Sequence, residues 1–140
     1  MIADRITPAA RAIDFLPLGE ADAAEMRALA RLTRPGPFAA LTHRLGGFIG
    51  VRREGRLVAM AGERMRTGGF TEVSGVCTHP DHRGQGYAGA LMRVVAARML
   101  ARGETPFLHT YADNRAAIGL YESLGFRLRA PLNMAVLVRG

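Results

Sequence analysis

The order of elements between residues 70 and 111 restricts the fold of this chain more than any other feature. Residues 70–78 have the pattern of a strand, in which Gly75 predicts a bulge or a bend. The segment that follows carries apolar side chains at helical spacing, at Ala88, Leu91, Met92, Val95 and Met99. Residues 106–111 have the pattern of a second strand. A strand, a helix and a strand in this order normally form a right-handed crossover between parallel strands, so the sequence predicts an α/β fold.

The rest of the chain supplies further strands and helices on both sides of this unit. We expect strands at residues 11–18, 48–52 and 56–65, helices at 19–32, 38–44 and 114–124, and two closing strands at 126–130 and 132–138. The expected order, βα(α)βββαβαββ, predicts a mixed central sheet of about six or seven strands flanked by helices. A length of 140 residues without a linker or a repeat indicates one domain, residues 1–140.

The net charge of the chain is +7, and all of its basic side chains other than histidine are arginines. Arginine suits planar pairing with phosphates and carboxylates, which leaves three interpretations: a nucleic-acid surface, a site for a polyanionic cofactor, or a composition habit of the source genome. The arginines are spread from Arg5 to Arg139 without a dense run, which disfavours nucleic acid as a partner. Composition does not separate the two interpretations that remain.

The sequence also bears on membranes and on the compartment. No apolar stretch is long enough to cross a bilayer, and the first residues do not resemble a secretion signal. The single cysteine, Cys77, cannot form an internal disulfide. These features predict a cytoplasmic protein without a membrane partner, and they leave a homodimer open.

A glycine-rich turn lies between the strand at residues 70–78 and the helix that follows it. The turn consists of Arg83, Gly84, Gln85, Gly86, Tyr87 and Ala88. Small residues let a ligand approach the backbone, and unpaired N–H groups at a helix N-terminus bind phosphate. Glycines also form tight turns without a ligand, and this turn lacks the Gly-Lys-Ser/Thr of a nucleotide P-loop. The turn therefore predicts a phosphate site only if a second motif supports it.

Two motifs in the second half of the chain supply that support. Residues 76–88, Val-Cys-Thr-His-Pro-Asp-His-Arg-Gly-Gln-Gly-Tyr-Ala, resemble the acetyl-CoA motif of the GNAT superfamily, with Arg83, Gly86 and Ala88 at its fixed positions. Residues 114–126 resemble its second signature, N-x-x-A-x-x-L-Y-E-x-x-G-F. The Cys-Thr-His-Pro-Asp-His-Arg-Gly portion is similar to the FR47-like branch. The resemblance implies a GNAT-like domain that uses acetyl-CoA as the co-substrate of N-acyl transfer.

The resemblance also implies which residues hold acetyl-CoA. The backbone of Val76, Cys77 and Thr78 would pair with the pantetheine arm. Pyrophosphate would be held by the amides of Gly84, Gln85, Gly86, Tyr87 and Ala88, next to the motif arginine, Arg83. Asn114 would contact the cofactor near the second opening of the sheet.

Three side chains are candidates for proton transfer. Tyr121 occupies the position from which many family members donate a proton to the departing CoA thiolate, although it could be an aromatic residue that only packs on the sheet. The acceptor amine must lose a proton before it attacks, and Glu72 lies where histone-type relatives carry a basic glutamate. Glu72 could instead be an ordinary solvent-facing carboxylate paired with an arginine. Glu63 is the alternate base or an acceptor-binding charge.

Two other features are weaker candidates. Cys77 could be the nucleophile of a two-step route, but a buried strand cysteine usually only packs, so we expect direct transfer in a ternary complex. His79 and His82 have no third ligand apparent in the sequence, so no metal site is expected.

The expected activity is transfer of an acetyl or other short acyl group from acyl-CoA to a primary amine. A backbone N–H near Val76 would polarise the carbonyl. The acceptor is a small-molecule or peptide amine whose identity the sequence does not give, and the length of the acyl group is open as well. A non-catalytic acyl-CoA-binding sensor or partner domain is the alternative, and an arginine-rich nucleic-acid module is the third hypothesis.

Overall fold

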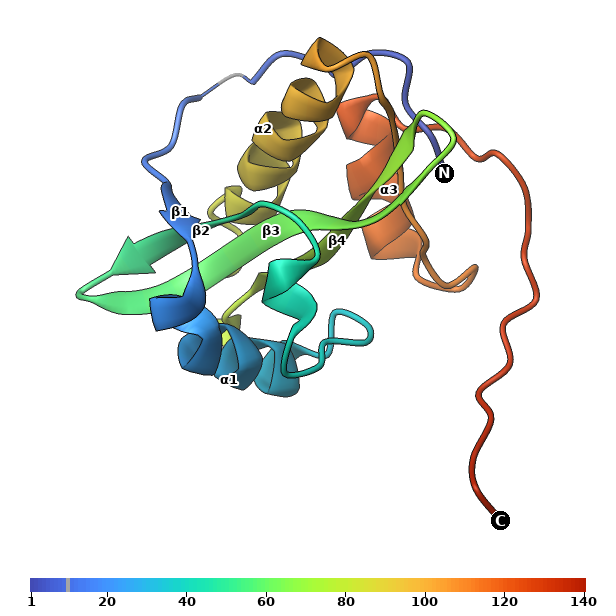
Figure 1. Cartoon of the computed structure of the whole chain (residues 1–140). Helices are drawn as coiled ribbons and strands as arrows, with labels where there is room; N and C mark the ends of the chain where they lie inside the picture. The colour runs from blue at the N-terminus through green and yellow to red at the C-terminus, as the bar shows by residue number, and fades with distance from the viewer. Residues whose placement is uncertain (10) are drawn as a thin grey trace.

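A mixed sheet runs through the molecule with helices on both of its faces (Figure 1). The computed structural model describes residues 1–9 and 11–140. The strands, in sheet order, are β1 (Leu16–Leu18), β2 (Phe48–Arg53), β3 (Arg56–Thr67), β4 (Phe70–Thr78) and β5 (Thr105–Phe107). Neighbours from β1 to β4 are antiparallel, and β5 is parallel to β4. The predicted α/β class and the parallel pair are therefore confirmed, with five strands in the described residues instead of six or seven.

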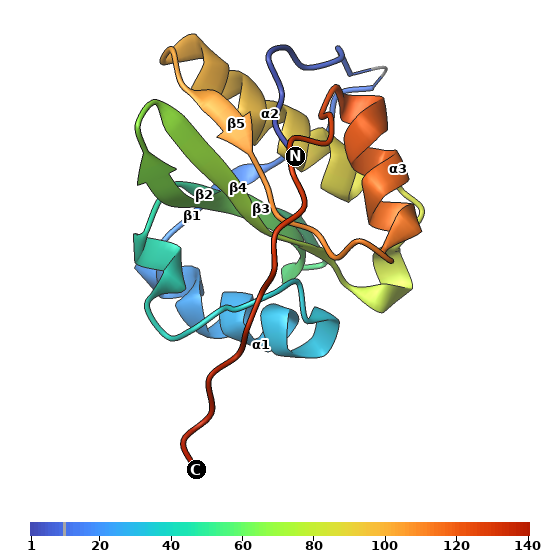
Figure 2. The same ribbon diagram turned by 90° about the vertical axis from the view of Figure 1, so that its right-hand side faces the viewer.

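Helices α2 (Tyr87–Ala101) and α3 (Arg115–Leu124) cover one face of the sheet, and α1 (Ala23–Thr33) covers the other (Figures 1 and 2). Short 3-10 helices are η1 (Glu20–Asp22), η2 (Thr42–Arg44) and η3 (Pro80–His82). The larger cluster of buried side chains lies between the sheet and α2, and a second cluster lies between the sheet and α1. No helix in the described part of the chain has the length and apolar character needed to cross a membrane.

β4 contains the bulge that Gly75 predicts. Its pairing with β3 shifts register between Ser74 and Cys77. Gly75 has a φ of +64°, and a Cβ at this position would lie 2.8 Å from the ring of Phe48. A side chain would suffer both the backbone strain and the clash, so glycine is required at the bulge.

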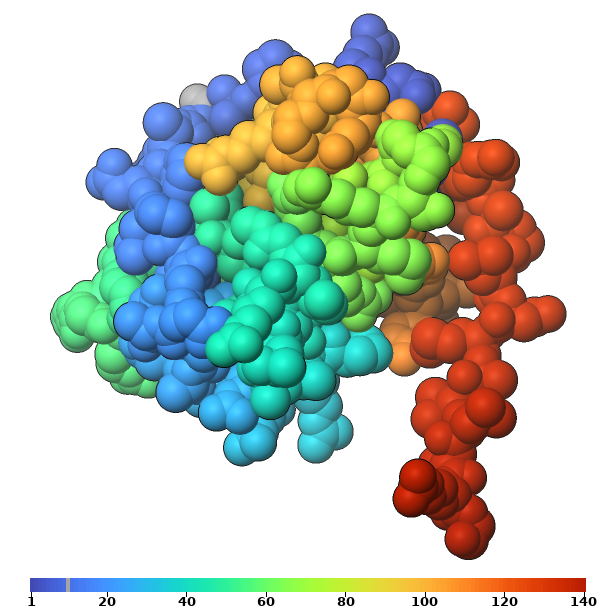
Figure 3. All heavy atoms as spheres, in the orientation of Figure 1, coloured from blue at the N-terminus to red at the C-terminus, as the bar shows by residue number. Residues whose placement is uncertain are grey.

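The closing strands expected at residues 126–130 and 132–138 are wrong. After α3, the described chain makes one isolated bridge, between Arg127 and Ile2. From Leu128 on, it forms neither helix nor strand and runs away from the body of the molecule (Figure 3).

The N-terminal residues explain this difference because they occupy the free edge of β5. The N–H of Ala3 donates to the carbonyl oxygen of Pro106 at 3.0 Å, and the N–H of Leu108 donates to that of Met1 at 2.9 Å. Ala3 is fully buried there. A closing strand beside β5 would need backbone groups that are already paired.

Candidate active site

β4 and β5 separate where β4 continues past the end of their common ladder. The parallel pairing joins residues 70–72 to residues 105–107 and stops there, while β4 runs on to Thr78. In open α/β sheets, ligands bind outside the carboxyl ends of the strands. The segment predicted to pair with pantetheine, residues 76–78, lies in the part of β4 that has left β5, so the structure places it at this opening.

The glycine turn predicted to hold pyrophosphate joins η3 to α2. Gly84 and Gly86 both have a φ of +77°, a left-handed conformation that glycine adopts without strain. A Cβ at either position would meet no atom within 4 Å, so the space next to the turn is open to a ligand. The turn leads into a 15-residue helix whose first N–H groups carry partial positive charge. These residues fit the phosphate groups of a CoA thioester.

Side chains packed beneath the turn hold it in place. The hydroxyl of Tyr87, which is 6% exposed, donates to Oε1 of Gln85 at 2.8 Å and accepts from Nε of Arg53 at 3.0 Å. The Arg53 guanidinium also lies 5.1 Å from the centre of the Tyr87 ring. Gln85 and Tyr87 therefore support the turn with their side chains, whereas Arg83 is exposed. Sequence reasoning missed Arg53 because it lies on β2, outside both motifs.

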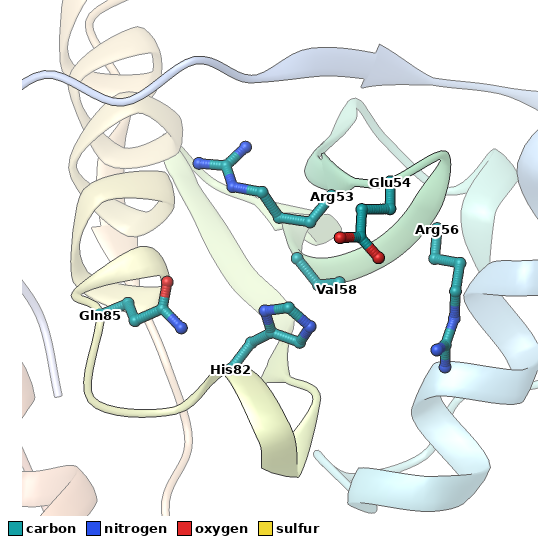
Figure 4. Close-up of a pocket in the computed structure, with 6 residues that line it drawn as sticks. All are labelled: Arg53, Glu54, Arg56, Val58, His82 and Gln85. Carbon is teal, nitrogen blue, oxygen red and sulfur yellow. The ribbon is translucent and has the colours of Figure 1, made fainter.

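A pocket of about 280 Å³ lies beside the turn, on the side of the β2–β3 hairpin. It is lined by Arg53, Glu54, Arg56, Val58, His82 and Gln85 (Figure 4). The first four residues come from the hairpin, and the last two come from the connection between β4 and α2. Two arginines against one glutamate make the surface around the turn basic, which suits a ligand that carries several phosphates.

Glu72 lies at the end of the paired part of β4 and is only 2% exposed. The guanidinium of Arg64 donates two hydrogen bonds to its carboxylate, both at 2.8 Å, and Nδ1 of His109 lies 2.8 Å from Oε1. Burial alone would raise the pKa of Glu72, but the hydrogen bonds from Arg64 and His109 outweigh it and keep this pKa below its usual value. Glu72 is thus a buried, ionised and paired carboxylate. The alternative of a solvent-facing Glu72 is wrong, whereas its arginine partner is present; the sequence identified neither Arg64 nor His109.

Glu63, the alternate base, lies on the other face of the sheet. It pairs across the ladder with Val73, whose side chain packs in the core beneath α2, whereas the adjacent Glu72 points the opposite way. The Glu63 carboxylate accepts hydrogen bonds from Arg66 at 2.8 Å and from Arg102 at 3.1 Å. The structure therefore does not bring the two candidate bases together, and Glu63 already has two arginine partners.

Tyr121 lies on α3, and Asn114 is the residue that caps the start of this helix. The Tyr121 ring packs edge-on against Phe126, with 6.5 Å between ring centres, and contacts the core beneath α2. Burial raises the pKa of Tyr121, so its hydroxyl stays protonated at neutral pH. Asn114 caps the helix by accepting the N–H of Ala117 on Oδ1 at 3.2 Å, which leaves its amide nitrogen as a donor toward a ligand.

The structure also describes the two weaker candidates, which are Cys77 and the pair of His79 and His82. Cys77 is 7% exposed, and burial raises its pKa to about 11, so the thiol is neutral and a poor nucleophile at neutral pH. The rings of His79 and His82 pack edge to face, 5.9 Å apart, and Nδ1 of His79 accepts the N–H of Asp81 at 3.1 Å. Among the residues that the structure describes, no three His, Cys, Asp or Glu side chains gather as metal ligands would.

Comparisons with known proteins agree with the motifs. A family model described as FR47-like protein matches residues 48–134. The crystal structure of a protein from Novosphingobium aromaticivorans, assigned to the GNAT acetyltransferases, superposes with a TM-score of 0.86 at 57% identity, covering 91% of this chain and 58% of that protein.

Two curated relatives are also similar. N-alpha-acetyltransferase RimI of Mycobacterium tuberculosis is 36% identical over 100 residues, which are 66% of this chain and 62% of RimI. An acetyltransferase of Yersinia pestis is 44% identical over 50 residues, which are 34% of this chain and 35% of that protein. The match spans about a third of the Yersinia protein and less than two thirds of RimI and of the Novosphingobium protein.

Proposed function

This chain belongs to the FR47-like branch of the GNAT acetyltransferases, and on that premise we propose that it transfers an acetyl group from acetyl-CoA to an amine. The transfer is direct, in one ternary complex, because the neutral, buried thiol of Cys77 is poorly suited to carry the acetyl group. We keep the cytoplasm as the proposed compartment, which suits a chain whose one cysteine is free.

The observation that carries this proposal is the position of the open glycine turn at the end of β4. Only the short helix η3 separates the turn from the part of β4 that has left β5. Phosphates held at Gly84 and Gly86 would therefore lie next to an opening in the sheet that could take the thioester end of the same ligand. The pantetheine arm would join the two sites along residues 76–78.

Different residues at the opening bind the pyrophosphate, polarise the acetyl carbonyl and donate a proton. The amides of residues 84–88, with the exposed Arg83, hold the pyrophosphate, and Asn114 adds a contact from the start of α3. A backbone N–H near Val76 polarises the acetyl carbonyl, which stabilises the charge that develops as the amine attacks. Tyr121 donates its proton to the departing sulfur, because a protonated leaving thiol is more stable than a thiolate.

We propose an α-amino group as the acceptor to test first, and a small-molecule amine as the second. The support for this order is the similarity to RimI of Mycobacterium tuberculosis, which is named as an N-alpha-acetyltransferase. A non-catalytic acyl-CoA sensor is the alternative, and it would bind acetyl-CoA without turnover.

Release of CoA thiol from acetyl-CoA tests the proposal. The purified protein is supplied in turn with short peptides, amino acids, polyamines and aminoglycosides, and each rate is compared with the rate without acceptor. Release above that background in one pool is the expected result. Acetyl-CoA binding without release in any pool would favour the sensor.

A further inference from the structure

The backbone places His109 on the face of the sheet where β4 and β5 separate. Phe107 is the last residue of β5 and pairs with Glu72. Leu108 is buried in the core beneath α2, and side chains alternate along an extended chain. His109 therefore points to the opposite face. Its ring packs edge to face against the ring of Phe107 and contacts the carboxylate of Glu72.

One nitrogen of the His109 ring is held by the protein, and the side chain is otherwise half exposed. Nδ1 lies 2.8 Å from Oε1 of Glu72, and the side chain is 49% exposed. In the described chain, the charged groups at this ring are Glu72 and, behind it, Arg64. A carboxylate at Nδ1 favours the tautomer with the proton on Nδ1, which leaves Nε2 as the free base nitrogen.

Glu72 itself is poorly placed to take a proton from an amine. One of its oxygens accepts from Nη2 of Arg64 and faces Nδ1 of His109, and the other accepts from Nε of Arg64. The side chain is 2% exposed. A general base must come within hydrogen-bond reach of the proton that it removes, and both partners of Glu72, Arg64 and His109, are more exposed than its carboxylate.

Resting on the acetyl transfer proposed above, we propose that His109 is the general base of the reaction and that Glu72 is a positioning residue that fixes its tautomer. The base is then His109, which Glu72 holds, and not Glu72 itself, to which the family resemblance gives this role.

The proton transfers balance in this scheme. The amine gives a proton to Nε2 of His109 as its nitrogen bonds to the acetyl carbonyl carbon. The bond from that carbon to sulfur breaks, and the sulfur takes the hydroxyl proton of Tyr121. His109 then releases its proton to water and Tyr121 regains one, so the products are the N-acetylated amine and CoA thiol.

Kinetics of His109→Gln test the role of base. We expect kcat to fall by about 10²- to 10⁴-fold, the usual contribution of acid–base catalysis, while the affinity for acetyl-CoA stays unchanged. Added imidazole should restore part of the rate to His109→Ala, an effect that lost packing would not produce.

The positioning role of Glu72 has its own measurements. Nitrogen-15 NMR of the wild-type protein should show the neutral His109 ring protonated at Nδ1, with the signal assigned by its loss in His109→Gln. In Glu72→Gln, the share of the Nδ1-protonated tautomer should fall, because an amide can donate to Nδ1 as well as accept from it. A wild-type ring protonated at Nε2, or a tautomer that Glu72→Gln leaves unchanged, would overturn the positioning role.

The outcomes separate the two proposals. If the wild-type protein acetylates an amine and His109→Gln does so at the same rate, the assignment of His109 is wrong and the proposed function stands. If the wild-type protein binds acetyl-CoA but acetylates no amine, the proposed function is wrong and the assignment of a base falls with it.

Discussion

At the scale of single residues, Tyr121 combines a packed ring with a hydroxyl that stays protonated at neutral pH. Tyr121→Phe keeps the ring and removes only the proton donor. We expect kcat to fall about 100-fold or more, because the leaving thiolate would go unprotonated, while thermal unfolding and acetyl-CoA affinity stay the same. Steady-state kinetics check this, and an unchanged kcat would leave Tyr121 with a packing role alone.

Gly86 can be tested against a glycine of the same conformation at the other end of α2. Gly86 and Gly103 have φ values of +77° and +76°, and neither has an atom within 4 Å of a Cβ position. Gly86→Glu should weaken acetyl-CoA binding by at least about tenfold, because it puts negative charge where the phosphates bind.

Calorimetric titration with acetyl-CoA measures this affinity, and Gly103→Glu is the matched control. The control carries the same backbone strain and the same charge away from the turn, so it should bind as the wild type does. Equal affinities for the two variants would argue against the turn as the phosphate site.

Residue-level prediction from sequence worked where a motif is local and failed where partners are distant. The glycine turn was found because its residues are consecutive. Arg53, Arg64 and His109 were missed, because their contacts with Tyr87 and Glu72 depend on which strands become neighbours and in what register. The roles of Glu72 and Tyr121 stay predictions.

At the scale of elements, the bulge in β4 should depend on Gly75. Gly75→Ala should lower the free energy of unfolding by about 1–3 kcal/mol, because Ala is strained at a φ of +64° and its Cβ would lie 2.8 Å from the Phe48 ring. Urea unfolding measures this.

Gly119→Ala is the control, since Gly119 lies within α3 with no atom within 4 Å of a Cβ position. Alanine is the better helix former, so this variant should be as stable as the wild type or more stable, by up to about 1 kcal/mol. A Gly75→Ala protein as stable as Gly119→Ala would mean that the bulge does not need glycine.

The elements themselves were predicted well where periodicity alone decides them. The apolar spacing of α2 and the β-type runs of β2, β3 and β4 are properties of each segment, and the structure confirms them. The outer strands were predicted less well, because the length of a strand also depends on the neighbouring strand with which it pairs. The strand expected at 11–18 is limited to Leu16–Leu18, and the one expected at 106–111 is Thr105–Phe107.

At the scale of the whole molecule, stability should depend on the first residues of the chain and not on the last ones. Residues 130–140 are exposed, with Leu132 at 71% and Leu137 at 95%. Deleting residues 130–140 should therefore leave the unfolding temperature unchanged. Ala3→Glu should lower the free energy of unfolding by about 2 kcal/mol or more, because it buries a carboxylate beside β5.

Thermal and urea unfolding of the two variants check this pair of expectations. A large loss of stability in the deletion variant would mean that residues 132–138 pair with the sheet in solution, as the sequence pattern predicts. Local sequence does not decide whether the N-terminal residues or residues 132–138 pair with β5. Both segments can form strands, and only the global arrangement determines which one occupies this edge.

We propose that the protein transfers acetyl groups from acetyl-CoA to amines at the opening between β4 and β5. Mass spectrometry of pooled peptides and small amines, incubated with acetyl-CoA and either wild-type protein or Gly86→Glu, tests it most directly. We expect an N-acetylated amine with the wild-type protein and far less of it with the variant. Unmodified amines in every pool, from a protein that still binds acetyl-CoA, would contradict it.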